Sequence, residues 1–213
     1  MSSSKNLLEF IINLFRRSKR KEYFARRGFE MTARNEGMFY LVAFILTIPF
    51  ANWMIGNIGV VCTDNGPCLI PVAPSVMAPS GVLMIGLALV LRDLIQRRLG
   101  KKWTIGAIVA GAILSALIAP PALVIASATA FLLSEFADFA VYTPLQEKKL
   151  VLAVFLSGIV GLVVDSIVFL QLAFGGLDYL TGQIVGKAWM ILLALPFIWI
   201  LRQRDDRLGI SPA

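Results

Sequence analysis

Histidine is absent from this 213-residue sequence. Without an imidazole, the chain cannot build histidine-liganded iron or zinc sites or a Ser-His-Asp catalytic triad. The phosphate-binding pattern Gly-x-x-x-x-Gly-Lys-Ser/Thr is absent too, because Gly186-Lys187-Ala188 lacks both the leading glycine and the hydroxyl. Catalysis is hard to build from the residues that remain, so we expect a protein that is not an enzyme and uses no cofactor.

Cysteine is scarce, and Cys62 and Cys68 are the only two. The residues between them, Thr-Asp-Asn-Gly-Pro, favour a turn. The thiols can therefore close a small ring if this loop lies on the oxidising, outer side of a bacterial inner membrane. A disulfide and two free thiols both stay open. Two thiols and one aspartate without histidine make a thin ligand set, so we expect no metal site.

Charged residues are also few, at 15% of the chain, whereas 58% of the residues are hydrophobic and the mean hydropathy is +0.79. This composition is typical of membrane proteins. Apolar runs that approach the ~20 residues needed to cross a bilayer occur at residues 38–56, 79–91, 103–119, 122–142, 150–174 and 180–201. The second run reaches that length only if it continues through Arg92 and Asp93. We predict an all-α integral membrane protein with six transmembrane helices.

These runs leave room for one transmembrane domain, residues 38–201, between a basic N-terminal arm, residues 1–37, and a short C-terminal tail, residues 202–213. In the arm, apolar residues recur at helical spacing and basic residues follow them. This pattern predicts an amphipathic helix on the inner leaflet, in contact with lipid. The alternative is a solvated basic tail that only enforces topology. Because the charges follow the apolar run, we do not expect a secretory signal.

The basic residues gather at alternate ends of the apolar runs. Of 20 Lys and Arg residues, 19 lie in the arm, in residues 92–102, at 148–149 or in the tail, and the exception is Lys187. The positive-inside rule therefore places both termini in the cytoplasm and residues 57–78 outside. The net charge of +7 follows largely from this topology and from attraction to anionic lipid. We expect no nucleic-acid partner.

Two carboxylates, Glu135 and Asp138, stand inside the fourth apolar run. A charge near the bilayer centre costs at least ~2.5–3.5 kcal/mol, so acids there usually face a partner, a ligand or water. Because the two are three residues apart, they share one helical face, which Phe131 and Tyr142 continue. Of the intramembrane charges, Glu135 is the one that a purely structural role explains least.

Counted at about 1.5 Å per residue through a ~30 Å core, the intramembrane polar residues fall into two layers. The inner layer consists of Arg92, Asp93, Glu135 and Asp138. The outer layer consists of Asn52, Asp165, Gln183 and Lys187.

Simpler interpretations of these residues stay open. Asp165 and Lys187 can form a purely structural ion pair. Arg92 and the acid after it can mark the cytoplasmic end of the second span. Trp53 and Trp189 are either interface anchors or platforms for a ligand.

The same segments carry a resemblance to a known family. Residues 131–145, FLLSEFADFAVYTPL, are followed by GLVVDS at 161–166 with Phe169, and by GQIVGKAW at 182–189. Together they resemble the bacterial queuosine-precursor transporters, also called the vitamin uptake transporter family. The resemblance covers residues 38–201. The basic arm and the cysteine-bearing loop depart from the family's compact pattern.

The resemblance implies import of 7-cyano-7-deazaguanine or a related deazaguanine across the bacterial inner membrane. It also implies a six-helix fold similar to the substrate-binding subunits of energy-coupling-factor vitamin transporters. The positions that match the family's motifs are Arg92, Asp93, Glu135, Asp138, Asp165, Gln183 and Lys187.

The chemistry of these residues suits such a substrate. A guanine-like edge presents two parallel N–H donors that one carboxylate can accept together, and Glu135 is the acceptor we favour. The ring oxo group suits Gln183, Lys187 or Asn52, and the flat ring can stack on an aromatic side chain for roughly 1–3 kcal/mol. Candidates for stacking are Phe136, Phe139, Trp53 and Trp189. The predicted substrate-binding set is Asn52, Trp53, Arg92, Asp93, Glu135, Asp138, Asp165, Gln183 and Lys187.

Two other functions stay open. One is a substrate-binding subunit for another vitamin that works with a separate ATPase module. The other is a membrane scaffold that transports nothing, which predicts no saturable ligand binding. The sequence leaves the energy source and the oligomeric state undetermined, and a homo-oligomer is an open alternative.

The distribution of basic residues generates a test of topology. A membrane-impermeant thiol reagent, added to intact spheroplasts after reduction, should label Cys62 or Cys68, because residues 57–78 face outward. Labelling that requires permeabilised membranes would reverse the predicted orientation.

Overall fold

The computed structural model describes residues 32–62, 67–119, 121–210 and 212. The chain divides into two units, Met1–Glu36 and Gly37–Ala213, and the second contains every site discussed below. The predicted amphipathic arm, residues 5–27, lies outside the described residues.

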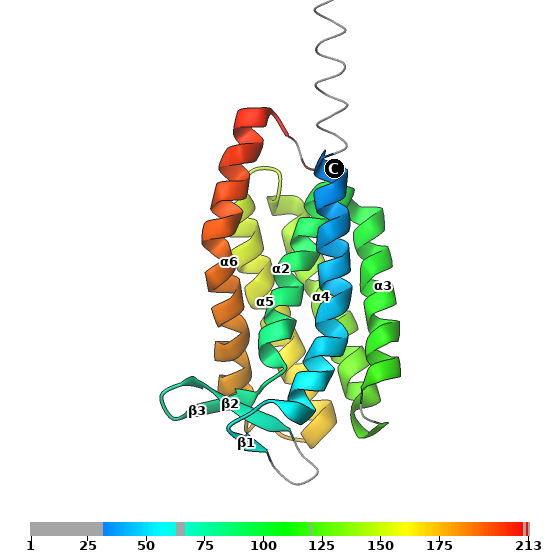
Figure 1. Ribbon diagram of the computed structural model, residues 1–213, viewed down its shortest axis with the longest axis vertical. Helices are drawn as coiled ribbons and strands as arrows, with labels where there is room; N and C mark the ends of the chain where they lie inside the picture. Colours follow the sequence, from blue (N-terminus) through cyan, green and yellow to red (C-terminus); the bar gives the residue numbers. More distant parts are fainter. Residues whose placement is uncertain (1–31, 63–66, 120, 211, 213) are drawn as a thin grey trace, which may run out of the picture. The chain divides into compact units, whose positions relative to one another are not determined.

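Six long helices correspond to the six predicted spans. The first is Thr32–Asn57, and the others are α2 (Val82–Leu99), α3 (Lys101–Ile118), α4 (Val124–Leu145), α5 (Leu150–Phe174) and α6 (Leu180–Leu208) (Figure 1). A short 3-10 helix, η1 (Pro121–Leu123), precedes α4. By length and composition, five of the described helices can cross a membrane, all except α2. The predicted all-α membrane fold is confirmed, with helix ends that differ most at the first helix, which begins at Thr32, and at α2 and α6.

Helix α2 departs most from its predicted span because it is the central helix. It packs against α3, α4, α5 and α6, and Figure 1 shows it between its neighbours. The helix runs on past Arg92 and Asp93 to Leu99, and both charged side chains are at most 1% exposed. A helix enclosed by other helices can carry charges that a lipid-facing helix cannot, because its neighbours supply partners. Arg92 therefore lies within α2 and does not mark its end.

Single glycines turn the chain between antiparallel helices. Gly100 has a φ of 84° and is the only residue between α2 and α3. Gly175, with a φ of 68°, ends α5 in the left-handed conformation. Glycine adopts these backbone angles without the steric cost that a Cβ atom imposes.

A small sheet fills the loop between the first helix and α2. Its antiparallel strands are β1 (Val61–Cys62), β2 (Cys68–Ala73) and β3 (Val76–Pro79), in the order β1-β2-β3. Cys62 pairs with Cys68 across the first two strands, and a disulfide joins them. The sequence analysis expected only a loop here, because the strands are short and β2 and β3 contain prolines, which are uncommon inside sheets.

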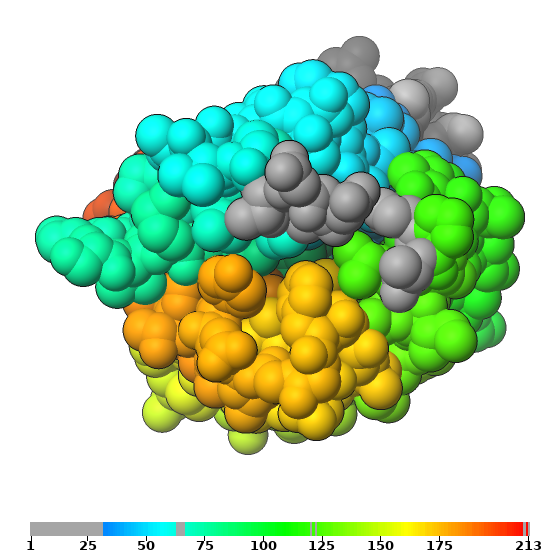
Figure 2. All heavy atoms as spheres, turned by 90° about the horizontal axis from the view of Figure 1, so that it is seen from below, coloured from blue at the N-terminus to red at the C-terminus, as the bar shows by residue number. Residues whose placement is uncertain are grey.

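The sheet is fixed to the helical bundle by α6. Both β2 and β3 pack on α6, and Trp189 Nε1 donates a hydrogen bond to Val72 O at 2.8 Å. Figure 2 views this end of the molecule and shows the strands beside the segment that connects α5 to α6. The opposite end of the bundle holds the start of α3, with Lys101 and Lys102, and the α4–α5 connection, with Lys148 and Lys149 (Figure 1).

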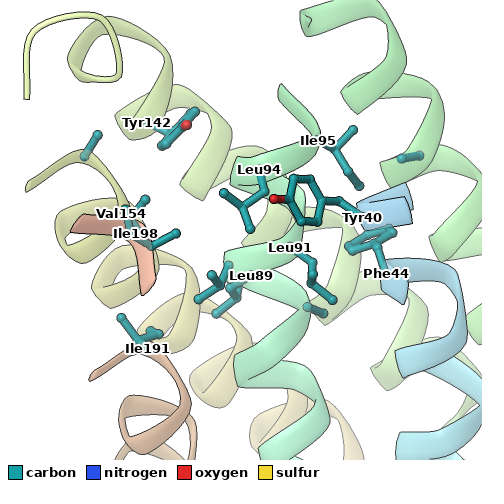
Figure 3. Close-up of a cluster of buried hydrophobic side chains, with 14 of the residues drawn as sticks. Tyr40, Phe44, Leu89, Leu91, Leu94, Ile95, Tyr142, Val154, Ile191 and Ile198 are labelled. Atoms are coloured by element: carbon teal, nitrogen blue, oxygen red, sulfur yellow. The ribbon is translucent and has the colours of Figure 1, made fainter. Parts of the chain in front are cut away.

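Apolar side chains from α2 form the centre of the core. Leu89, Leu94 and Ile95 are at most 2% exposed, and they lie between the first helix and the pair α5 and α6 (Figure 3). Phe44 packs on one side, with Val154, Ile191 and Ile198 on the other. This packing fixes the height of α2, and therefore the positions of its charged residues, relative to the other helices.

Helix α6 packs so closely on the sheet that no side chain fits at Gly182. A Cβ atom on Gly182 would collide with the backbone oxygen of Met77 and lie 3.2 Å from Ala78 Cβ. We expect Gly182→Ala to cost about 1–3 kcal/mol of stability, as overpacking does. Gly106→Ala is the matched control, because a Cβ at Gly106 meets nothing within 4 Å. Thermal unfolding followed by circular dichroism in detergent measures both, and equal stabilities would contradict this close packing.

Candidate functional site

A cavity opens at the sheet end of the helical bundle. It contains about 740 Å³ of empty space, including open solvent at its mouth. The walls are mostly apolar and come from the first helix, the start of α2, α3, η1 with the start of α4, α5 and α6. An apolar cavity with a few polar groups is what a small organic ligand requires.

Three of the nine predicted substrate-binding residues line this cavity, namely Asn52, Asp165 and Gln183. They come from the first helix, α5 and α6, so the fold joins residues that are up to 131 positions apart in sequence. Asn52 Nδ2 donates to Ile48 O at 3.0 Å, which leaves the amide oxygen as the group able to accept from a ligand.

Lys187 holds the side chains of Asp165 and Gln183 in place by hydrogen bonds. Its ammonium donates to Asp165 Oδ2 at 2.5 Å, to Gln183 Oε1 at 2.5 Å and to Ser166 Oγ at 2.8 Å. Lys187 is fully buried, and three acceptors match its three N–H groups. The ion pair between Lys187 and Asp165 that the sequence left open is therefore present.

This arrangement fixes which atoms are left to bind a ligand. Because Gln183 Oε1 accepts from Lys187, its Nε2 amide remains as a donor. Asp165 Oδ1 remains as an acceptor and has only a long contact, 3.5 Å, from Ser134 Oγ. A carboxylate acceptor and an amide donor thus lie together in the cavity wall.

A second polar cluster lies on α2, α4 and α5 and does not line the cavity. Arg92 is its centre: Nη2 lies 2.9 Å from Asp93 Oδ1 and forms an ion pair with Asp138 Oδ1, and Nε lies 3.3 Å from Glu135 Oε2. All four side chains are at most 2% exposed. We call Arg92, Asp93, Glu135 and Asp138 the arginine cluster.

Neighbouring residues complete the arginine cluster. Ser157 Oγ donates to Asp93 Oδ2 at 3.0 Å, and Arg92 Nη1 donates to Gln96 Oε1 at 3.4 Å. The Arg92 guanidinium lies 5.5 Å from the ring centre of Tyr142, a cation–π contact. The inner layer predicted from depth is therefore one connected group. Contact between Glu135 and a ligand stays a prediction, since this acid faces Arg92.

The predicted tryptophans lie elsewhere. Trp53 is 50% exposed and stacks on Phe50, with ring centres 5.6 Å apart, beside a separate shallow groove. Trp189 is 48% exposed and bonds to the sheet. The aromatic rings in the cavity wall belong to Phe131 and Phe169. Helical spacing places Phe131 on the face of Glu135, and Phe169 stands beside the Asp165 motif, but neither was predicted as a stacking ring.

A third cluster lies at the end of the bundle opposite the cavity, and the sequence analysis missed it. Asp205 on α6 accepts from Arg97 Nε at 2.7 Å and from Arg98 Nη1 and Nη2 at 3.0 and 2.8 Å. Asp205 was placed in the tail, whereas α6 continues to Leu208 and carries this acid into the bundle. No group of three metal-ligating side chains occurs among the described residues.

The buried Lys187–Asp165 pair generates a prediction about stability. Lys187→Met should cost about 3–5 kcal/mol, because it leaves a buried carboxylate without its cation. The double variant Asp165→Asn/Lys187→Met should be more stable than either single variant. Exposed Lys148 supplies the control, Lys148→Met. Denaturation in mixed detergent measures all four variants, and additive effects of the two single changes would show that the pair contributes no coupling energy.

Comparison with known proteins agrees with the sequence motifs. Residues 117–201, which contain α4, α5 and most of α6, match the model of the family described as "Putative vitamin uptake transporter". No curated protein and no solved structure gives a significant match. The likeness of the fold to energy-coupling-factor subunits therefore stays a prediction. Residues 117–201 are therefore similar to the vitamin uptake transporter family, which is consistent with the resemblance that the motifs carry.

Proposed function

We propose that this multi-pass membrane protein imports a 7-deazaguanine, such as the queuosine precursor 7-cyano-7-deazaguanine, across the bacterial inner membrane. The family match supports vitamin-type uptake by a transporter and favours a protein that is not an enzyme. The observation that carries the choice of substrate is the pair of groups in the cavity wall, the Asp165 carboxylate beside the Gln183 amide.

These two groups complement the hydrogen-bonding edge of a guanine. The ring N1–H and the exocyclic amine are adjacent donors, and the carboxylate of Asp165 can accept from both. Its Oδ2 retains a lone pair after accepting from Lys187. Gln183 Nε2 can then donate to the ring oxo group. A site built from such directional bonds rejects analogues that lack the donors, because the buried polar groups would stay unpaired.

The apolar part of the cavity suits a flat ring. Phe131 and Phe169 stand in the wall with aliphatic side chains from the first helix and α2. Stacking of a heterocycle on an aromatic ring contributes about 1–3 kcal/mol and tolerates a variable substituent. Asn52 supplies a further amide oxygen near the mouth. We therefore place the ligand in this cavity, with Asp165 as its acceptor in place of Glu135.

The direction of transport follows from the charges at the two ends. The basic connections lie opposite the sheet, and the positive-inside rule assigns that basic end to the cytoplasm. The cavity then opens on the outer side, and both termini lie in the cytoplasm. The disulfide between Cys62 and Cys68 suits this orientation, since disulfides persist outside the cytoplasm. The outward-open cavity is the state that captures substrate.

Uptake in whole cells tests the function directly. Cells that lack both their own importer and precursor synthesis should regain queuosine in tRNA when they express this chain and receive 7-cyano-7-deazaguanine. Specific binding of another vitamin, with no binding of deazaguanine, would overturn the proposal. Co-purification of ATPase subunits would instead indicate a substrate-binding subunit of a larger transporter.

Binding by the purified chain tests the role of Asp165. The double variant Asp165→Asn/Lys187→Met keeps the buried site neutral, so it should fold, yet it lacks the carboxylate acceptor. We expect at least tenfold weaker binding of radiolabelled deazaguanine, which corresponds to about 1.4 kcal/mol. Asp178→Asn is the control, since Asp178 is an exposed acid in the α5–α6 connection and is not part of the cavity wall. Unchanged affinity in the double variant would remove Asp165 from the binding site.

A further inference from the structure

The arginine cluster has more negative than positive charge. It contains three carboxyl groups and one guanidinium, so its charge would be −2 if every acid were ionised. Other nearby cations are already engaged, Lys187 by Asp165 and Arg97 by Asp205. Uncompensated charge in an apolar bundle costs several kcal/mol. The cluster therefore favours a further positive species, and one added positive charge would reduce its charge from −2 to −1.

Two of the acids, Asp93 and Asp138, contact the same nitrogen of Arg92. Asp93 Oδ1 and Asp138 Oδ1 both contact Nη2 of Arg92, which brings two carboxyl oxygens onto one nitrogen. Gly161 lets α5 pack closely at this point, since a Cβ there would lie 3.1 Å from Asp138 Oδ2. Two carboxylates confined in this way repel each other, and binding one proton between them removes the repulsion.

The other titratable or charged groups around this pair do not supply the missing charge. From α2 and α4 come Arg92, Glu135, the phenol of Tyr142 and Arg97, which interacts electrostatically with that phenol. From α5 comes Asp165, and from α6 comes Lys187, which neutralise each other. The first helix contributes the phenol of Tyr40 to the surrounding core. None of these neighbouring groups therefore compensates the excess negative charge of the arginine cluster.

A stripe of buried polar side chains on α4 passes through the cluster. Ser134, Asp138, Tyr142 and Gln146 recur every four residues, and each is at most 3% exposed. Ser134 contacts Asp165 in the cavity wall. Further along, the Tyr142 hydroxyl and Gln146 Oε1 are buried without a hydrogen-bond partner among the described residues. Buried polar atoms without partners are uncommon and call for an explanation. The stripe extends from the cavity to the end of α4 that lies near the basic connections.

A proton fits this site better than a metal ion. The Arg92 guanidinium occupies the centre of the three acids and would repel a second cation, whereas a proton bonds to one carboxyl oxygen and removes its charge. No described group of three side chains has a geometry that holds a metal. The hydroxyl and carboxyl groups of the stripe on α4 are also groups that can exchange a proton with water.

We propose that Asp93 and Asp138 form a proton-binding pair that couples import of the ligand to proton entry. This inference rests on the proposed function, because it supplies the energy source for the same transporter. A proton from the outer side binds one carboxyl oxygen of the pair while the cavity is open. When the bundle rearranges, the carboxyl releases the proton along the α4 stripe to the cytoplasm, and the cluster regains its negative charge.

Infrared spectroscopy of the purified full-length chain tests the bound proton without any ligand. At neutral pH the wild-type chain should show the C=O stretch of a protonated carboxyl group, shifted in deuterium oxide. Asp93→Asn and Asp138→Asn should each remove that band, because the remaining acid stays ionised beside Arg92. The control Asp178→Asn should retain it. Absence of the band in the wild-type chain would overturn the proposal.

Uptake into proteoliposomes tests the coupling. For one proton per ligand molecule, a pH difference of one unit, acid outside, supports up to about tenfold accumulation of radiolabelled 7-cyano-7-deazaguanine. A protonophore should abolish this accumulation, and uptake by Asp138→Asn should no longer respond to the gradient. Gradient-driven uptake by Asp93→Asn/Asp138→Asn, or a requirement for sodium in place of the pH gradient, would overturn the inference. A wild-type chain that shows the carboxyl band but binds no deazaguanine would refute the proposed function and leave the proton site standing.

Discussion

The structure depends on the burial of Arg92 in the middle of α2. A guanidinium at this depth is stable only if acids on other helices reach it, and Asp138 and Glu135 on α4 do so. This requirement sets the height and rotation of α2 against α4, and Ser157 extends it to α5 through Asp93. The leucines of α2 then pack between the first helix and α5 and α6. Arg92 is thus both a packing constraint and the centre of the chemistry we infer.

Three buried polar clusters divide the bundle by level. The Lys187–Asp165 pair lies at the cavity, the arginine cluster lies further in, and Asp205 with Arg97 and Arg98 lies toward the basic end. Each cluster joins helices that are distant in sequence, so each can stabilise one arrangement of the bundle. Their compositions also differ: the first pairs one acid with one ammonium, the second joins three acids to one guanidinium, and in the third one acid accepts from two guanidinium groups. A transporter that changes conformation must break some buried contacts and form others. Because the three clusters lie at different levels, each end of the bundle has polar contacts of its own to exchange.

The sequence was sufficient for the class of protein, and it named three of the residues that line the cavity. Hydropathy and helical spacing are local properties, so the six helices and the two polar layers could be read from residue types alone. Spacing also placed Glu135 and Asp138 on one face, and depth counted along the spans brought Gln183 and Lys187 to the level of Asp165. The predicted end of α6 differs from the observed one. Arg202 and the charged residues after it suggested a tail, whereas the helix continues to Leu208.

Only the tertiary structure decided which polar residues meet each other and which face the cavity. Glu135 and Asp165 are both buried acids by sequence, yet Arg92 engages the first and the cavity exposes the second. The sequence also did not show that the ring of Trp53 stacks on Phe50 and stands outside the wall of this cavity. The sequence left the disulfide open, whereas the structure pairs Cys62 with Cys68 across β1 and β2 and packs β2 on α6. The physical reason is that hydropathy fixes the depth of a residue in the membrane, whereas the rotation and pairing of helices arise from contacts between residues far apart in the chain.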